Sequence, residues 1–178
     1  RDLHSFPTRR SSDLNLLYDE PLVLLIPADH PWAGREDVDP AELDDQKLLM
    51  LDEGNCLRDQ TLALCQRYGV NPPIAVATTL ATVVGMVTHG VGATVIPEGA
   101  LRLLGHDGAF AVARFAEPGA VRRIGLVHRT SSSRGEDFTR LAEVITGLAR
   151  DAGLPMRPLS ESVDTDVRIG RRARRGRS

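Results

Sequence analysis

Short apolar runs alternate with helical patterns over most of the chain. The apolar runs predict strands at 22–26, 47–51, 74–77, 93–96, 109–115 and 122–128. Apolar residues at helical spacing predict helices at 56–68, 79–89 and 136–150, with shorter helical turns after Asp39 and after Glu98. Since the strands alternate with helices, the pattern predicts an α/β fold with a largely parallel sheet.

The last predicted helix is amphipathic, and the sequence offers no evident cover for its apolar side. The stripe consists of Phe138, Leu141, Val144, Ile145 and Leu148. An uncovered apolar stripe favours association. We therefore expect residues 15–153 to be unstable or prone to aggregation by themselves.

A long uncharged segment lies between Arg67 and Glu98, so a membrane span has to be considered. The segment contains several threonines and glycines, a histidine, and a break between Gly90 and Gly92, which makes it a poor lipid-facing helix. A buried strand–helix–strand unit explains the lack of charge better.

Both ends of the chain differ in composition from its centre. Residues 1–14 show no periodicity and resemble a translated sequencing adapter, so we expect a non-native lead and a domain at 15–153. Residues 154–178 carry seven arginines against three acids and predict a disordered tail, with a nucleic-acid contact as the alternative. The rest of the chain is acidic, which argues against a duplex-binding surface there.

The composition, 42% hydrophobic and 26% charged, is sufficient for one sizeable core. Two cysteines are too few for a disulfide-rich secreted scaffold, and no segment has the pattern of a secretory signal. We therefore expect a cytoplasmic protein.

Cys56 and Cys65 are the two cysteines, nine positions apart within a predicted helix. At about 1.5 Å per residue, an intact helix separates them by roughly 13 Å along its axis. A disulfide requires Cα atoms within about 4.4–6.8 Å, so the helix and the bond exclude each other. Oxidation of the pair would force the segment to refold, as in a redox switch. Two unrelated thiols are the alternative.

The two thiols differ in their expected surroundings. Asn55 is a good N-cap residue, so Cys56 would occupy the first helical position, where free backbone N–H groups and the helix dipole favour a thiolate. Arg58 adds a cation nearby. Cys65 lies on the apolar stripe of the same helix, where a thiol behaves as a small buried hydrophobic group. The pattern predicts one reactive and one sheltered cysteine.

The same region carries motifs of a known family: DHPW at 29–32, KLLMLDEGNCLRDQ at 47–60 and GVGATVIP at 90–97. With these motifs, residues 15 to about 152 resemble the effector domain of LysR-type transcriptional regulators. Within that family, GNCLRDQ with a second cysteine nine residues after the first resembles the OxyR-type hydrogen peroxide sensors.

The resemblance implies a periplasmic-binding-protein-like (type 2) fold of two lobes. This chain would contain the second lobe and the C-terminal segment that returns to the first lobe. The winged helix-turn-helix domain would lie outside this chain. The implied partners are DNA through that missing domain, further copies in a dimer or tetramer, RNA polymerase, and a reductant of the glutaredoxin or thioredoxin type.

The resemblance also implies roles for individual residues. Cys56 would react with peroxide, and Cys65 would resolve the product in a reversible disulfide. The peroxide pocket would be formed by Asn55, Arg58, Asp59, Thr79 and Arg122. Asn55 stands where the family usually has histidine, and an amide cannot take up a proton. We therefore expect weaker peroxide reactivity than the motif suggests.

Three of these pocket residues have simpler interpretations. Asp59 fits a first-turn acid that complements the helix dipole, Arg122 fits a solvated charge on a strand, and Thr79 fits an N-cap.

We expect no metal, because the histidines lack zinc-site spacing, and no cofactor, because Gly90 and Gly92 lack the third glycine of a dinucleotide loop. A regulatory domain would not be an enzyme. Two alternatives stay open: a LysR-type domain that binds a small metabolite between its lobes, and a thiol peroxidase.

Overall fold

A long strand, β1 (Ser12–Pro27), forms the spine of the molecule. The computed structural model describes residues 12–105, 108–117 and 119–159. In its C-terminal half β1 pairs with β4 (Thr94–Pro97) on one edge and with β5 (Phe110–Arg114) on the other. In its N-terminal half it pairs with β6 (Val121–Arg129). All three pairings are antiparallel.

The prediction of a largely parallel sheet is therefore wrong for the described residues. Parallel pairing joins β2 (Leu48–Leu51) to β3 (Ile74–Ala77), which form a separate two-stranded sheet. Local alternation of strands and helices does not encode strand direction. In this fold β4, β5 and β6 all run antiparallel to β1, and contacts far apart in the sequence set that direction.

The predicted elements are present at close to their predicted positions. The three main helices are α1 (Cys56–Tyr68), α2 (Leu80–Thr88) and α4 (Gly135–Asp151). The shorter ones are the 3₁₀ helices η2 (Pro40–Asp45) and η3 (Glu98–Ala100) and the single turn α3 (Leu101–Leu104). As predicted, the helical turn after Asp39 begins with an Asp39 cap, and Glu42 completes a capping box.

The spine strand is longer than its apolar run predicts. It begins at Ser12, so residues 12–14 of the segment expected to be non-native lie in a strand paired with β6. Asp19 and Glu20 interrupt the apolar pattern because they are charged, so the pattern did not predict this part of the strand. Both residues are nevertheless buried. Their burial depends on two arginines of β6, with which they form ion pairs.

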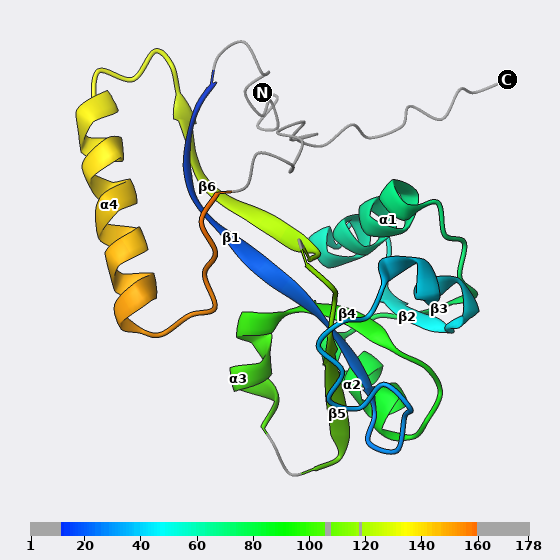
Figure 1. Cartoon of the computed structure of the whole chain (residues 1–178). Coiled ribbons are helices and arrows are strands. Elements are labelled where there is room, and N and C mark those ends of the chain that lie inside the picture. The colour runs from blue at the N-terminus through cyan, green and yellow to red at the C-terminus, as the bar shows by residue number, and fades with distance from the viewer. Residues whose placement is uncertain (1–11, 106–107, 118, 160–178) are drawn as a thin grey trace, which may run out of the picture.

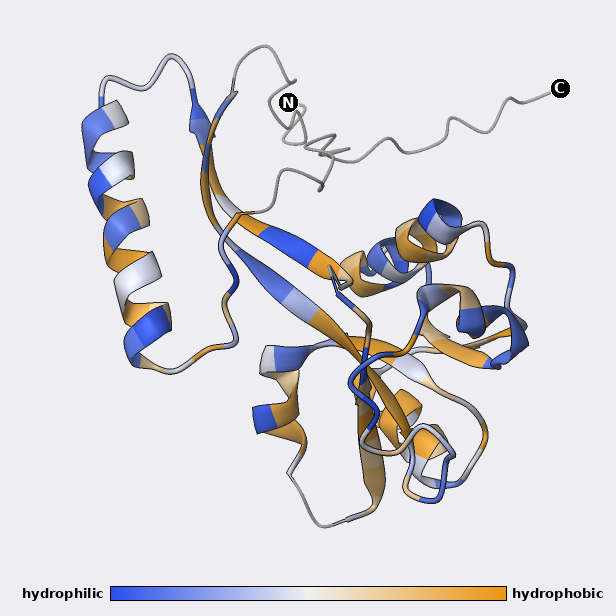
Figure 2. Ribbon diagram, viewed as in Figure 1, coloured by the Kyte–Doolittle hydropathy of each residue, from blue (hydrophilic) through white to orange (hydrophobic). Residues whose placement is uncertain are grey.

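Two core clusters lie on opposite faces of the β1–β4–β5 sheet. Alternate residues of β1 enter each cluster: Leu22, Leu24 and Ile26 on one face, Val23 and Leu25 on the other. The first face is covered by α1 and η2, and the second by α2 and α3. The part of β1 at 22–26 is buried on both faces, which explains why its apolar run is continuous (Figure 2).

The arrangement has two parts (Figure 1). The first part holds α1, α2, α3 and β2–β5, and the second holds α4 beside the N-terminal half of β1 and β6. The uncharged segment folds as β3, α2 and β4, and no described helix is long and apolar enough to cross a membrane.

The apolar stripe of α4 is only partly covered among the described residues, with three of its five members exposed. Leu141, Val144 and Leu148 are 44%, 56% and 63% exposed. Phe138 stacks on His128 of β6, and Ile145 is half-buried. After α4, residues 154–159 turn back to β1, where Arg157 and Asp19 exchange two backbone hydrogen bonds of 2.8 and 3.2 Å. The rest of the arginine-rich tail lies outside the described residues.

Candidate functional site

The corner between β2 and α1 presents the first cysteine. The chain leaves β2 at Leu51 and turns through Gly54, whose φ of +90° favours glycine. The Asn55 side-chain oxygen then accepts a hydrogen bond of 3.0 Å from the Leu57 N–H. Cys56 is the first residue of α1 and is exposed. The predicted N-cap and the predicted position of this thiol are both confirmed.

Cys65 lies two and a half turns further along the same helix, in the core. It is 5% exposed and packs in the cluster that contains Leu64 and Val70. Burial raises the pKa of the Cys65 thiol, because a thiolate loses its hydration there. The predicted sheltered thiol is confirmed, and both cysteines are free.

An unbroken helix holds the two thiols apart. Thirteen residues from Cys56 to Tyr68 form α1, and Gly69 ends it in the left-handed region at φ +68°. The Cys65 carbonyl accepts a 3.0 Å hydrogen bond from the Val70 N–H, which fixes this end of the helix. At roughly 13 Å of axial separation, no disulfide forms unless α1 unwinds.

Two predicted pocket residues share the first turn of α1 with Cys56. Arg58 donates a 3.2 Å hydrogen bond to the Leu51 carbonyl, so its guanidinium ties α1 to the end of β2. Asp59 is exposed, and its N–H donates to the Asn55 carbonyl at 3.3 Å. Its carboxylate sits in the first turn, where it complements the helix dipole.

Thr79 and Arg122 lie on other elements. Thr79 is the N-cap of α2, and its hydroxyl accepts a 3.1 Å hydrogen bond from the Thr82 N–H, as predicted for a cap. Arg122 lies on β6 and pairs with the buried Glu20 of β1 at 2.7 Å, so its interpretation as a solvated strand charge is wrong. Among the described residues, no hydrogen bond or ion pair joins either of them to α1.

Two adjacent cross-strand ion pairs on β1 and β6 were missed by the sequence reasoning. Glu20 faces Arg122, and Asp19 faces Arg123 with contacts of 2.8 and 3.0 Å. The hydrogen bond from Arg123 to Asp19 raises the pKa of the Arg123 guanidinium. The signal was the Asp-Glu dipeptide and a later Arg-Arg dipeptide, which antiparallel register brings face to face.

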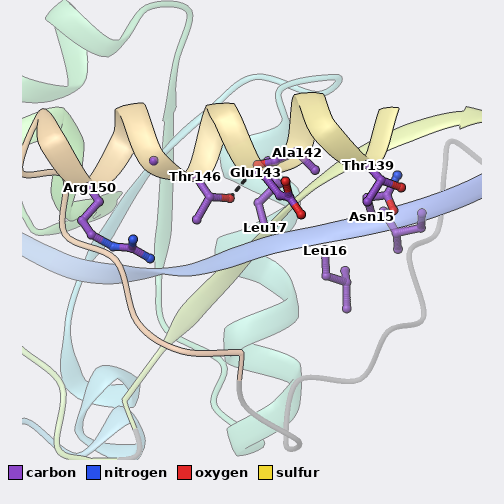
Figure 3. A pocket seen from close by; sticks show the side chains of 10 residues that line it. Asn15, Leu16, Leu17, Thr139, Ala142, Glu143, Thr146 and Arg150 are labelled. Carbon is purple, nitrogen blue, oxygen red and sulfur yellow. Dashed lines mark hydrogen bonds between the residues drawn. The ribbon is translucent and has the colours of Figure 1, made fainter. Parts of the chain in front are cut away.

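An open groove of about 650 Å³ lies away from the cysteines, between β1 and α4. Figure 3 shows Asn15, Thr146 and Arg150 around it. The side-chain nitrogen of Asn15 is buried with no hydrogen-bond partner. The sequence could not indicate this groove, because its walls are more than a hundred residues apart in the chain.

The sequence is similar to proteins of one known family. The family model of the LysR substrate binding domain matches residues 4–175. The probable hydrogen peroxide-inducible genes activator of Mycobacterium avium is 45% identical over 131 residues, which cover 72% of this chain and 42% of that protein. The Escherichia coli K12 DNA-binding transcriptional dual regulator OxyR is 40% identical over 130 residues, covering 72% and 43%.

Solved structures show the same likeness. A Corynebacterium glutamicum OxyR C206 mutant superposes with a TM-score of 0.70 at 35% identity, covering 88% of this chain and 52% of that one. The effector binding domain of QuiR in complex with shikimate, at 19% identity and a TM-score of 0.61, shares the fold alone. The periplasmic-binding-protein-like α/β fold is therefore confirmed. The chain spans less than half the length of these two curated relatives.

Proposed function

Because the chain belongs to the family of LysR substrate-binding domains, we propose that it is the redox-sensing regulatory domain of a hydrogen-peroxide-responsive transcription regulator. The observation that carries the proposal is the pair of free thiols on α1, one exposed at its first residue and one buried nine residues later. The names of the relatives, peroxide-inducible gene activators and OxyR, support the same function.

The chemistry uses two thiols for one peroxide molecule. The Cys56 thiolate attacks one peroxide oxygen, the O–O bond breaks, and hydroxide leaves, which takes up a proton to become water. The sulfenic acid on Cys56 is then attacked by the Cys65 sulfur. A disulfide forms and a second water leaves. Two thiols are oxidised, and hydrogen peroxide is reduced to two waters.

The second step requires α1 to change shape. The buried residues of α1, Thr61, Leu64 and Cys65, begin in its middle, whereas Cys56 and Asp59 at its start are exposed. The first turns therefore bury less apolar surface and unwind at lower cost. Cys56 would move to Cys65, with the first turns of α1 refolding and the core end staying in place.

In this proposal the first turn of α1 also binds and orients peroxide. Asn55, Arg58 and Asp59 lie within three positions of Cys56, and Thr79 and Arg122 would supply the rest of the pocket from α2 and β6. Asn55 already uses its oxygen as the helix cap and has no proton-accepting group. We therefore expect Asn55→His to speed the reaction of Cys56 with peroxide.

The proposal extends to the complete regulator. It would bind DNA through a separate domain, act as a dimer or tetramer with RNA polymerase in the cytoplasm, and be reset by a dithiol reductant of the glutaredoxin or thioredoxin type. It would sense peroxide stoichiometrically and would not be an enzyme.

Thiol counting under limiting peroxide tests the function. Treatment with one equivalent of hydrogen peroxide should consume both thiols and give an intramolecular disulfide, visible as a shifted band after thiol alkylation. Cys65→Ser should stop at the sulfenic acid of Cys56, and Cys56→Ser should retain its thiol. An unchanged thiol count in wild type would exclude the sensor. Many peroxide turnovers with a dithiol donor would instead indicate a peroxidase, and a Cys56→Ser protein that still responds would indicate a metabolite-binding domain.

A further inference from the structure

An arginine of the cysteine-bearing part caps the end of α4. Arg102, on α3, donates from Nη1 to the Ala152 carbonyl at 2.6 Å and from Nη2 to the Gly153 carbonyl. Carbonyls at a helix C-terminus lack partners within the helix, and a cation there also meets the negative end of the dipole. Arg102 therefore joins the two parts of the molecule at the end of α4.

The backbone around this contact is shaped to admit the guanidinium. Gly153 has a φ of +62°, and a Cβ at that position would lie 3.2 Å from Arg102 Nη2. A second guanidinium, that of Arg157, bonds Glu117 at 2.8 and 3.0 Å. The short segment after α4 is thus fastened at both ends, by Arg102 at its start and by Arg157 near its end.

The apolar neighbours of Arg102 share a core cluster with the first turn of α1. Leu101 is buried in this cluster, and Leu104 packs against it. Leu57, the residue after Cys56, packs against the same cluster. The turn that would refold on oxidation and the turn that carries Arg102 therefore have one apolar cluster in common.

We propose that Arg102 couples the redox state of α1 to the anchoring of α4, an inference that rests on the proposed function. Unwinding of the first turn of α1 removes Leu57 from the shared cluster. The single-turn helix α3 then loses packing, and Arg102 releases the Ala152 and Gly153 carbonyls. The two-state element is α1, and α4 with its partly covered apolar stripe is the part that responds.

Hydrogen exchange at the end of α4 measures the coupling directly. The amides of Ala152, Gly153 and Leu154 bond to carbonyls of the last turn of α4 and report its opening. In reduced protein, Arg102→Gln should raise exchange over 148–154 by about two- to fivefold relative to wild type. Arg140→Gln removes the same charge from an exposed position in the N-terminal half of α4 and should leave that exchange unchanged.

Oxidation completes the test. Peroxide should raise exchange over 148–154 in wild type to the level of Arg102→Gln, and should add nothing further in that variant. Arg102→Lys keeps the charge but lacks the paired N–H donors of the guanidinium. In the reduced state its exchange over 148–154 should lie between that of wild type and that of Arg102→Gln. Unchanged wild-type exchange despite a formed disulfide would overturn the coupling alone. If no disulfide forms, the thiol count shows that the proposed function has failed, and the coupling fails with it.

Discussion

Asp19, where β1 meets β6, is a buried carboxylate that forms an ion pair with Arg123. Its side chain is 1% exposed, and that of its partner Arg123 is 11% exposed. A charge so far from water is tolerated only when it is paired and hydrogen-bonded. The backbone of Asp19 also pairs with Arg157, so three segments of the chain meet at this residue. The chemistry of a single carboxylate thus fixes where β1, β6 and the segment after α4 come together.

Replacing Asp19 tests this role. Asp19→Asn removes the charge that compensates Arg123, and should lower the free energy of unfolding by about 3–5 kcal/mol. Urea unfolding followed by circular dichroism measures the loss. Asp137→Asn breaks the exposed Arg134–Asp137 pair of α4 and should cost at most about 1 kcal/mol. Equal effects of the two substitutions would show that the Asp19 pair contributes no more than a surface contact.

At the scale of elements, β2 and β4 are joined through a close backbone approach. The Leu49 N–H donates to the Ala93 carbonyl at 2.7 Å, and the Ala93 N–H donates to the Lys47 carbonyl at 2.9 Å. A Cβ at Gly92 would overlap the Lys47 carbonyl oxygen. Glycine at this position therefore permits the bridge between the β2–β3 sheet and the β1–β4–β5 sheet.

The expected effect of Gly92→Ala is destabilisation by about 1–3 kcal/mol, because the backbone of Lys47 must shift. Gly85→Ala provides the matched comparison. Gly85 lies inside α2, and a methyl group there would meet nothing within 4 Å, so alanine should stabilise by about 0.5–1 kcal/mol. Thermal melting should show a lower melting temperature for Gly92→Ala and a higher one for Gly85→Ala. A stable Gly92→Ala protein would show that the two sheets are not held by this approach.

At the scale of the whole molecule, α4 leaves much of its apolar stripe exposed. Its exposed residues Leu141, Val144 and Leu148 lie on one stripe, and Phe138 of that stripe stacks on His128 of β6. Figure 2 shows α4 beside β1 and β6. A helix of this kind is completed by another surface or associates through its apolar side. We therefore expect self-association of this chain to depend on α4.

Two substitutions test whether self-association depends on the α4 stripe or on exposed apolar residues in general. Leu141→Gln combined with Leu148→Gln should reduce self-association in sedimentation velocity without lowering the melting temperature. Leu103→Gln is the control, because Leu103 is 87% exposed on α3 and outside the stripe. If the control lowers association as much as the double variant, the α4 stripe is not the associating surface.

The candidate site could largely be predicted from sequence because it is local. The cap at Asn55, the first helical position of Cys56 and the burial of Cys65 follow from residue types and helical spacing within one element. The Thr79 cap and the helical turn after Asp39 were predictable for the same reason.

What the sequence determined by itself is therefore the set of elements and the incompatibility of α1 with a disulfide, since both depend on short-range periodicity and covalent geometry. The tertiary structure decided the antiparallel pairing of β1, the burial of Asp19 and Glu20 against Arg123 and Arg122, and the capping of α4 by Arg102. These contacts join residues 50 to more than 100 positions apart. Their formation depends on how packing of the core orients whole elements, which no local pattern specifies.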